Sequence, residues 1–221
     1  MPFSDIESKK QELIRKALGG GALLAPIATP ALAALTEDTG AGVIDLAIPP
    51  EYRDLGYMPD DGISHSVETS QSDITSWQSV SPTRSDTTSE TWQVTVVLQE
   101  TKKESIALYY GAHLAALVAD ATTGEVVLDL PETPSSRAYR LLTLAVDKDQ
   151  EGDEIYIARL FPNAKVVGKA EQVFGKGDQA IGWGLTFQGF KDSTLGTAQR
   201  TFFGGPGWQK LLTPMGFTSG S

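Results

Sequence analysis

The two histidines of the chain lack the neighbours that catalysis or metal binding requires. His65 stands between Ser64 and Ser66, which suggests a nucleophile with its base, but adjacent residues of a strand point to opposite faces and cannot meet. His65 and His113 do not have the spacing of paired zinc ligands, and the chain has no cysteine. The sequence therefore predicts neither a catalytic triad nor a zinc site.

An acidic segment offers the best imitation of a metal site. Asp147, Asp149 and Glu151 alternate along the chain and precede Gly152, as in the first half of an EF-hand loop. The twelfth position of such a loop must be a bidentate Glu, but here it is Ala158. We therefore interpret residues 147–152 as an acidic hairpin turn, and we expect no cofactor.

The chain has four tryptophans, which raises the possibility of a platform for sugar rings. Two of them, Trp92 and Trp183, stand on the apolar side of alternating strands, where core packing is the ordinary role. Motifs for a nucleophile elbow, a phosphate-binding loop or a dinucleotide site are absent from the sequence. The residues thus favour a protein that is not an enzyme.

The charges are concentrated in one part of the chain. Of a net charge of −10 over 221 residues, residues 54–101 contribute eight carboxylates and a single cation, Arg84. An acidic element of this kind is suited to a surface that repels a polyanion. It is equally suited to a surface that becomes ordered by contact with further copies of the same protein. A protein this acidic cannot hold a nucleic-acid backbone by counterion release, so any contact with DNA should be non-adhesive.

Two segments within this acidic part, residues 63–68 and 92–100, alternate apolar and polar side chains as half-buried strands do. Period-two alternation predicts that the apolar members face a core and the polar members face away from it. The polar members are Ser64, Ser66, Glu68, Gln93, Thr95 and Gln99. Residues 79–91 have Val80 as their one apolar side chain and predict a long exposed loop. Its proline and charged residues are Pro82, Arg84, Asp86 and Glu90.

A helix is expected over about residues 101–117, because Thr101 and Glu104 form a capping box. The rest of the chain is a series of short alternating segments, at residues 125–130, 137–146, 154–161, 164–174, 180–190 and 198–203. Turn residues separate these segments. The pattern predicts a mainly β domain over residues 51–203, either a sandwich or a barrel, with one flanking helix.

The N-terminal residues 1–50 predict a short helix over residues 4–18, followed by an apolar extended arm. Residues 17–36 are uncharged and imitate a secretory signal, but Gly19–Gly21 and two prolines break the helix that a signal or a membrane span needs. Residues 204–221 predict a second arm. Arms of this length are most easily ordered by neighbouring subunits, and the expected contacts are Leu23, Leu24, Pro26, Pro30 and Trp208.

Several short motifs, in this order, carry a resemblance to a known family. They are Leu55-Gly56-Tyr57 with Asp61-Gly62-Ile63, Ile74-Thr75-Ser76-Trp77-Gln78, residues 92–101, Leu108-Tyr109-Tyr110-Gly111, Phe161-Pro162-Asn163 and the Asp192 turn before the last strand. Over residues 20–205 this order resembles the major tail tube protein of long-tailed, non-contractile (siphovirus-type) bacteriophages.

The resemblance implies a structural virion protein that is made in the host cytoplasm. It implies hexameric rings that stack into the tail tube, with tape-measure and tail-terminator proteins as further partners. On this interpretation the polar strand faces line a channel without cations, through which double-stranded DNA passes during ejection. The loop at residues 79–91 would lie between rings, and the two arms would contact neighbouring copies.

Two other classes of protein remain open at this stage. A non-catalytic β-sandwich that binds a carbohydrate or a protein partner would share the composition, but would gather its aromatic residues on loops. A hydrolase on the same fold would need converging carboxylates or a triad, which this sequence does not assemble.

Overall fold

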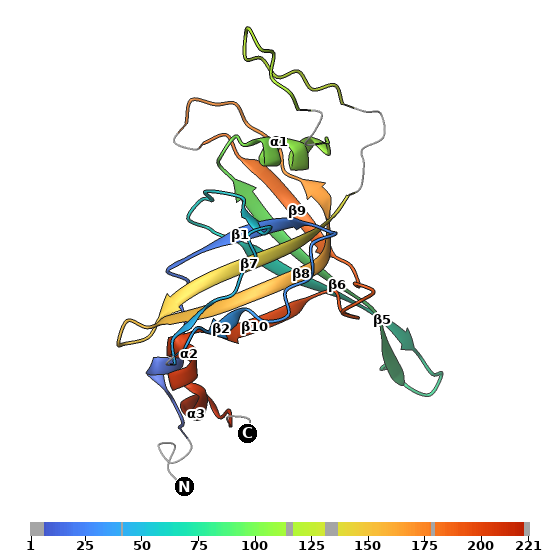
Figure 1. Cartoon of the computed structure of the whole chain (residues 1–221). Coiled ribbons are helices and arrows are strands. Elements are labelled where there is room, and N and C mark those ends of the chain that lie inside the picture. The colour runs from blue at the N-terminus through green and yellow to red at the C-terminus, as the bar shows by residue number, and fades with distance from the viewer. Residues whose placement is uncertain (1–6, 41, 114–116, 131–136, 178–179, 219–221) are drawn as a thin grey trace.

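One antiparallel sheet forms the body of the molecule (Figure 1). The structure is a computed structural model that describes all residues except 1–6, 41, 114–116, 131–136, 178–179 and 219–221. Within the described chain the strand order is β4-β1-β7-β8-β9-β6-β5, and β10 pairs with β8. The strands are β1 (Gly19–Pro26), β4 (Arg53–Asp54), β5 (Ser64–Ile74), β6 (Arg84–Leu98), β7 (Ala138–Lys148), β8 (Glu154–Lys169), β9 (Trp183–Gly189) and β10 (Arg200–Gly204). A separate small ribbon consists of β2 (Thr36–Asp38) and β3 (Ile44–Leu46).

The sheet divides at Pro162, in the middle of β8. Proline cannot donate a ladder hydrogen bond and occurs within sheets at edges or bulges. Here the register of β7 against β8 shifts between Tyr139 and Leu141, opposite Pro162. Before this bulge β8 pairs with β7 and β10, and after it β8 pairs with β7 and β9. The sequence predicted two separate strands here, but β8 continues through both segments.

The two parts of the sheet enclose the larger core. Val94, Val96 and Leu98 of β6 are fully buried and meet Leu141 of β7 and Phe161 of β8. A second core lies on the other face of β7 and β8, where residues 31–52 contribute to the cover. The mainly β fold predicted from the sequence is confirmed.

Three short helices flank the sheet. The helix α1 (Lys103–Tyr110) lies at one end, and α2 (Pro206–Lys210) and α3 (Leu212–Met215) lie at the other (Figure 1). The predicted helix 101–117 is shorter than expected because Gly111 adopts a left-handed conformation, φ 69°, and ends it. The predicted capping box was wrong: the N-cap is Lys102, and Thr101 Oγ1 instead accepts a hydrogen bond from Trp183 Nε1 at 3.4 Å.

Within the described residues, no helix has the length and apolar character that a membrane crossing requires.

The N-terminal region departs most from the prediction. The described part of the expected helix 4–18 contains one turn of 3-10 helix, η2 (Gln11–Leu13). The expected free arm is instead β1, whose eight residues all pair with β7. Glycine allows this close approach, because a Cβ on Gly20 would lie 2.2 Å from the carbonyl oxygen of Leu144. The apolar stretch is thus covered by the chain's own sheet, and the β domain begins before residue 51.

Three further predictions need correction. Residues 84–91 of the expected loop are strand residues of β6, so the turn between the strands spans residues 75–83. Residues 125–130 contain one isolated bridge, between Ala119 and Val126, rather than a strand. The expected C-terminal arm forms α2 and α3, and Trp208 of α2 stacks on Phe203 at a ring distance of 5.0 Å.

A buried ion pair fixes the bulge. Arg140 and Asp192 are 8% and 6% exposed, and their charged groups lie 2.6 Å apart. The Arg140 guanidinium also donates to the carbonyl oxygens of Pro162 and Thr29. The backbone N–H of Leu195 and the Arg140 guanidinium hold the pKa of Asp192 below its usual value. One arginine therefore ties β7, the bulge of β8 and two loops together.

Replacement of Arg140 should destabilise the fold strongly. In Arg140→Met the Asp192 carboxylate stays buried without its partner, and removal of one member of a buried pair costs about 3–5 kcal/mol. The measurement is urea unfolding at pH 7. The matched control is Arg84→Met, which breaks an exposed ion pair, 2.6 Å long with side chains 68% and 50% exposed, and should cost less than about 1 kcal/mol. Equal losses in the two variants would contradict the central role of Arg140.

Candidate functional site

A polar face covers β5, β6 and β9 on the side away from the core. The strand registers place two rows of side chains across it, Ser64, Thr95 and Thr186 in one and Ser66, Gln93 and Gln188 in the other. In the first row the hydroxyls of Thr95 and Thr186 lie 3.2 Å apart. Glu68 continues this face along β5, and exposed Gln99 follows the end of β6. The alternation predicted from the sequence is present, and which surface of an assembly the face lines stays a prediction.

The polar face contains a cation that the sequence analysis did not place there. Lys165 of β8 is the register partner of Gln188 and so points to the same side of the sheet. Its Nζ lies 5.3 Å from the centre of the Phe190 ring, a distance at which the ring attracts the ammonium group. The expectation of a face without cations was therefore wrong, because β8 was not known to lie next to β9.

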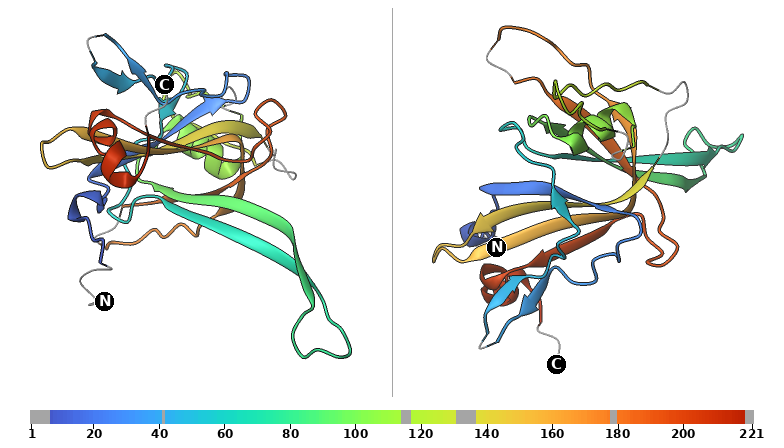
Figure 2. Two further views of the ribbon diagram at one scale, coloured as in Figure 1. Left: turned by 90° about the horizontal axis from the view of Figure 1, so that it is seen from below. Right: turned by 45° about the horizontal axis from the view of Figure 1, so that its top comes forward.

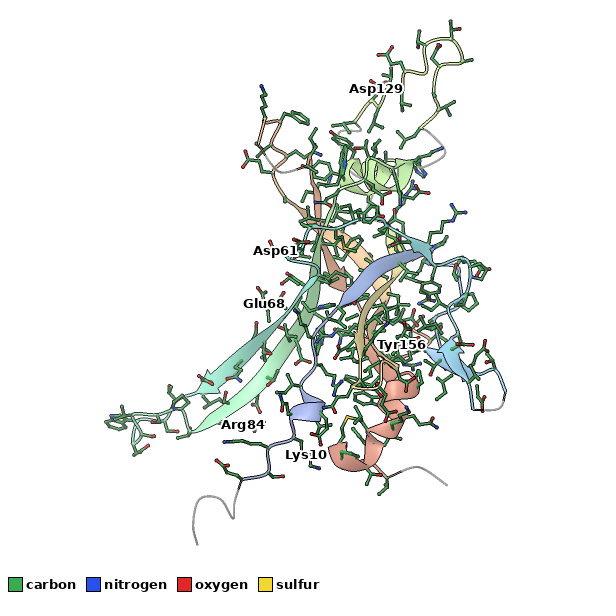
Figure 3. The ribbon with its side chains drawn as sticks, turned by 90° about the vertical axis from the view of Figure 1, so that its left-hand side faces the viewer. Lys10, Asp61, Glu68, Arg84, Asp129 and Tyr156 are labelled. Atoms are coloured by element: carbon green, nitrogen blue, oxygen red, sulfur yellow. The ribbon has the colours of Figure 1, made fainter. Side chains whose placement is uncertain are left out.

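Beyond this face, β5 and β6 continue as a two-stranded hairpin that projects from the molecule (Figure 2). The pairing of β6 with β9 begins at Trp92, and within the described chain the first part of β6, residues 84–91, pairs with β5 alone. Glu68 and Arg84 lie along this hairpin (Figure 3). Arg84 makes an ion pair with Asp86, Nε to Oδ2, at 2.6 Å, and Glu90 and Pro82 are exposed.

The turn of this hairpin carries apolar side chains in the solvent. Trp77 is 99% exposed, Ile74 is 54% exposed and Val80 is fully exposed. The sequence analysis treated Trp77 as one of four tryptophans and did not assign it to a surface. The polar neighbours Thr75, Ser76 and Gln78 gave no clear signal of exposure, because the apolar residues Ile74 and Val80 stand at helix spacing from Trp77.

The residues expected to contact neighbours from the arms mostly pack within their own chain. Leu24 packs on the larger core and Leu23 on the second core, as successive residues of β1 must. The carbonyl oxygen of Pro30 accepts a hydrogen bond from the Tyr52 hydroxyl at 3.3 Å. Trp208 packs between Phe203 and Phe217. Pro26 is exposed at the end of β1.

The acidic turn that imitates an EF-hand is the β7–β8 hairpin turn, as predicted. Asp149, Glu151 and Asp153 bring their carboxylates within 4.8 Å of one another. The Lys210 ammonium group makes ion pairs with Asp153 and Glu151, and these bonds raise the pKa of the lysine. Asp149 accepts the backbone N–H groups of Glu151 and Asp153, each at 2.9 Å. Lysine and backbone groups thus use the carboxylates that a metal would need.

A cavity of about 780 Å³ lies between the start of β5 and the faces of β1, β7 and β8. Its wall includes Gly20, Met58, Ile63, His65, Thr143 and Arg159. His65 stacks on Phe161 with a ring distance of 6.2 Å, and its Nε2 lies 3.0 Å from Thr143 Oγ1. Burial, assisted by the Arg159 charge, lowers the pKa of His65 to about 4. His65 points inward while Ser64 and Ser66 are exposed, so the three residues form no nucleophile–base pair.

The comparison with known families gives a match over most of the chain. The model of the family described as phage tail tube protein matches residues 7–198. The chain belongs to the phage tail tube proteins. A search among curated proteins gives no match. The matched residues of this tail tube protein include all strands from β1 to β9 and the Asp192 turn, and end before β10.

Membership in this family gives the main function. A tail tube protein is a structural component of the virion tail, and copies of it assemble into a tube. The polar face, the projecting hairpin and the cavity are therefore candidate assembly surfaces. The family match does not extend to the particular residues that form each contact.

The cavity histidine should make the stability of this tail tube protein depend on pH. Since the pKa of His65 is about 4 in the folded chain and about 6.5 in an unfolded chain, the unfolded state takes up the proton first. Stability should therefore fall as the pH drops from about 6.5 to about 4, by at most about 3 kcal/mol. The free energy of unfolding of His65→Gln, measured in urea, should fall less between pH 7 and pH 5 than that of the wild type.

The control for this measurement is His113→Gln, because His113 is exposed. That variant should keep the pH dependence of the wild type. If His65→Gln and the wild type lose stability in parallel over this range, the buried neutral histidine is not responsible.

Proposed function

We propose that six copies form a ring and that stacked rings form the tube through which double-stranded DNA leaves a long-tailed, non-contractile phage. Apart from family membership, one observation supports this proposal. The strand β5, eleven residues long, is an open edge of the sheet. An exposed edge strand of this length pairs readily with another chain. Closure of several such sheets into one barrel removes the free edges and encloses a channel.

In this arrangement the polar face of β5, β6 and β9 lines the channel. This face consists of hydroxyl and amide groups and the Glu68 carboxylate, so DNA in the channel would meet few cations. Lys165 is the exception, and its contact with the Phe190 ring keeps it near the sheet. A net charge of −10 per chain adds a repulsive field, so DNA passes without the many phosphate contacts that create tight binding.

The projecting hairpin is proposed as the contact between rings, in place of the longer loop expected from the sequence. Its strands hold the turn at residues 75–83 away from the sheet (Figure 2). The tape-measure protein inside the tube and the terminator protein at its end are further proposed partners. Synthesis in the host cytoplasm and a non-enzymatic role belong to the same proposal.

Assembly can be tested with the purified full-length protein. Electron microscopy and mass measurement should show rings or tubes of the wild type, with six copies per ring. Deletion of residues 75–83, joined by a two-residue turn, should leave a folded chain that forms no tubes, because the exposed turn makes no contribution to the core. A wild type that remains a compact monomer at high concentration would remove the proposal and favour a partner-binding module.

The channel lining can be tested in phage particles. The double variant Gln93→Lys, Gln99→Lys should form tubes but slow DNA ejection at low salt, because each new phosphate contact adds a salt dependence with a slope of about 0.9. Ejection should recover as the salt concentration rises. The control is Gln150→Lys in the β7–β8 turn, which should eject normally. Normal ejection by the double variant at low salt would place this face outside the channel.

A further inference from the structure

The turn of the β5–β6 hairpin has the composition of a contact surface and no contact within its own chain that covers it. Trp77, Val80 and Ile74 expose most of their side chains at the end of a ribbon. Apart from these three and Pro82, all residues from Glu68 to Thr88 are polar or charged. A group of exposed apolar residues that includes a tryptophan is typical of protein interfaces, where tryptophan is enriched. Asp73 beside Ile74 is also exposed, and within the described chain its carboxylate forms no ion pair.

The cavity beside β5 offers features that complement the hairpin tip, namely apolar side chains and an arginine. Met58, Ile63 and Ile157 give it an apolar wall. Arg159 is half-buried on the same wall, and among the described residues its guanidinium makes no hydrogen bond and no ion pair. A guanidinium has five donors in a planar array that fits a carboxylate. The lining of the cavity also includes four carboxylates, Asp54, Asp60, Asp61 and Glu100. Arg159 is the partly desolvated cation of this wall, and its guanidinium can bind a further carboxylate.

The charges at the rim of the cavity also fit the hairpin. Glu100 is neutralised by Lys102 at 2.7 Å. Three exposed carboxylates remain in the lining, Asp54 on β4 and Asp60 and Asp61 on the turn before β5 (Figure 3 labels Asp61). Arg84, close to the hairpin tip, pairs with Asp86 at 2.6 Å, but an exposed ion pair of this kind is weak enough to exchange its partner for a carboxylate at the rim. A carboxylate for the wall and a guanidinium for the rim are thus both present on the same short ribbon.

The hairpin tip cannot enter the cavity of its own chain. His65 lines the cavity near the start of β5, whereas Ile74 ends this strand. Nine residues of extended chain separate the two by about 30 Å, and the hairpin runs away from the sheet (Figures 1 and 2). A contact between the two features therefore joins different copies. Because it joins unlike surfaces, it continues from copy to copy as rings or filaments do.

We propose that the cavity is the socket for the hairpin tip of a second copy, with Trp77 against the apolar wall and Asp73 paired with Arg159. This inference rests on the proposed tube and assigns the two surfaces that meet in it. Trp77 and Asp73 form the tip side, and Arg159 with Met58, Ile63 and Ile157 forms the socket side.

The first experiment compares single variants in assembly. Trp77→Ser and Asp73→Arg should each raise the protein concentration needed for tubes at least 10-fold, while their urea unfolding midpoints stay at the wild-type value because both side chains are exposed. The control Val127→Ser changes another exposed residue, 67% exposed, and should assemble normally. Tubes of Trp77→Ser at the wild-type concentration would overturn the socket and leave the tube itself intact.

The second experiment exchanges the charges of the proposed pair. Arg159→Asp should fail to assemble like Asp73→Arg, and a chain that carries both changes should recover tubes, because each interface again has one anion and one cation. A double variant no better than the single variants would overturn the pairing. If instead the wild type forms no tubes, the proposed function fails before this comparison is reached.

A third measurement follows the environment of Trp77 itself, with a conservative aromatic variant as the reference. The fluorescence of Trp77, isolated as the difference between the wild type and Trp77→Phe, should shift to shorter wavelength on assembly and become protected from acrylamide. Full access of acrylamide to Trp77 in finished tubes would overturn the socket, whatever the effect of the variants.

Discussion

Proline at position 162 cannot complete the ladder of hydrogen bonds in a strand that is paired on both sides, and the architecture follows from this. The register slips at the bulge, β8 changes one of its partners, and a single sheet becomes two surfaces that enclose a core. The freed carbonyl oxygen of Pro162 needs a donor, which Arg140 supplies, and Asp192 neutralises the buried guanidinium. Backbone geometry at one residue thus requires a charge pair that also holds the loops on either side.

The two faces of this sheet differ in their chemistry. Side chains that face inward are apolar and stabilise each chain, whereas the outward face of β5, β6 and β9 has small hydroxyl and amide groups. The apolar contact surface is placed elsewhere, at the end of the hairpin. A tail tube needs both properties, since its subunits must bind one another tightly while its contents must move freely. In the tube proposed above, different parts of the same pair of strands meet the two requirements.

Much of the fold could be predicted from local pattern. Alternation at residues 92–98 identified the buried face of β6, because side chains that alternate with period two can divide between the two faces in only one way. The sequence could not show that β1 belongs to the sheet, since its three glycines and apolar residues read equally well as a free arm. Only the register of β1 against β7 reveals why glycine is needed. Lys165 was missed for a related reason, because its position depends on which strand lies beside β9.

The candidate site was predicted less well than the fold. Arg159 and Trp77 carry no pattern in the sequence that distinguishes a cavity arginine or an exposed tryptophan from ordinary ones. Their significance depends on tertiary structure, because Arg159 is half-buried in a cavity wall and Trp77 is exposed at the end of the hairpin. By contrast, the acidic character of the hairpin was evident from composition alone.

The direction of the hairpin has a consequence for the polarity of any assembly. It leaves the sheet on one side only, so a stack in which all copies share one orientation has two chemically different ends. One end displays ribbons with exposed tryptophans, which the other end lacks. Proteins that begin the stack and proteins that close it must therefore recognise different surfaces, and growth from the two ends is governed by different encounter steps.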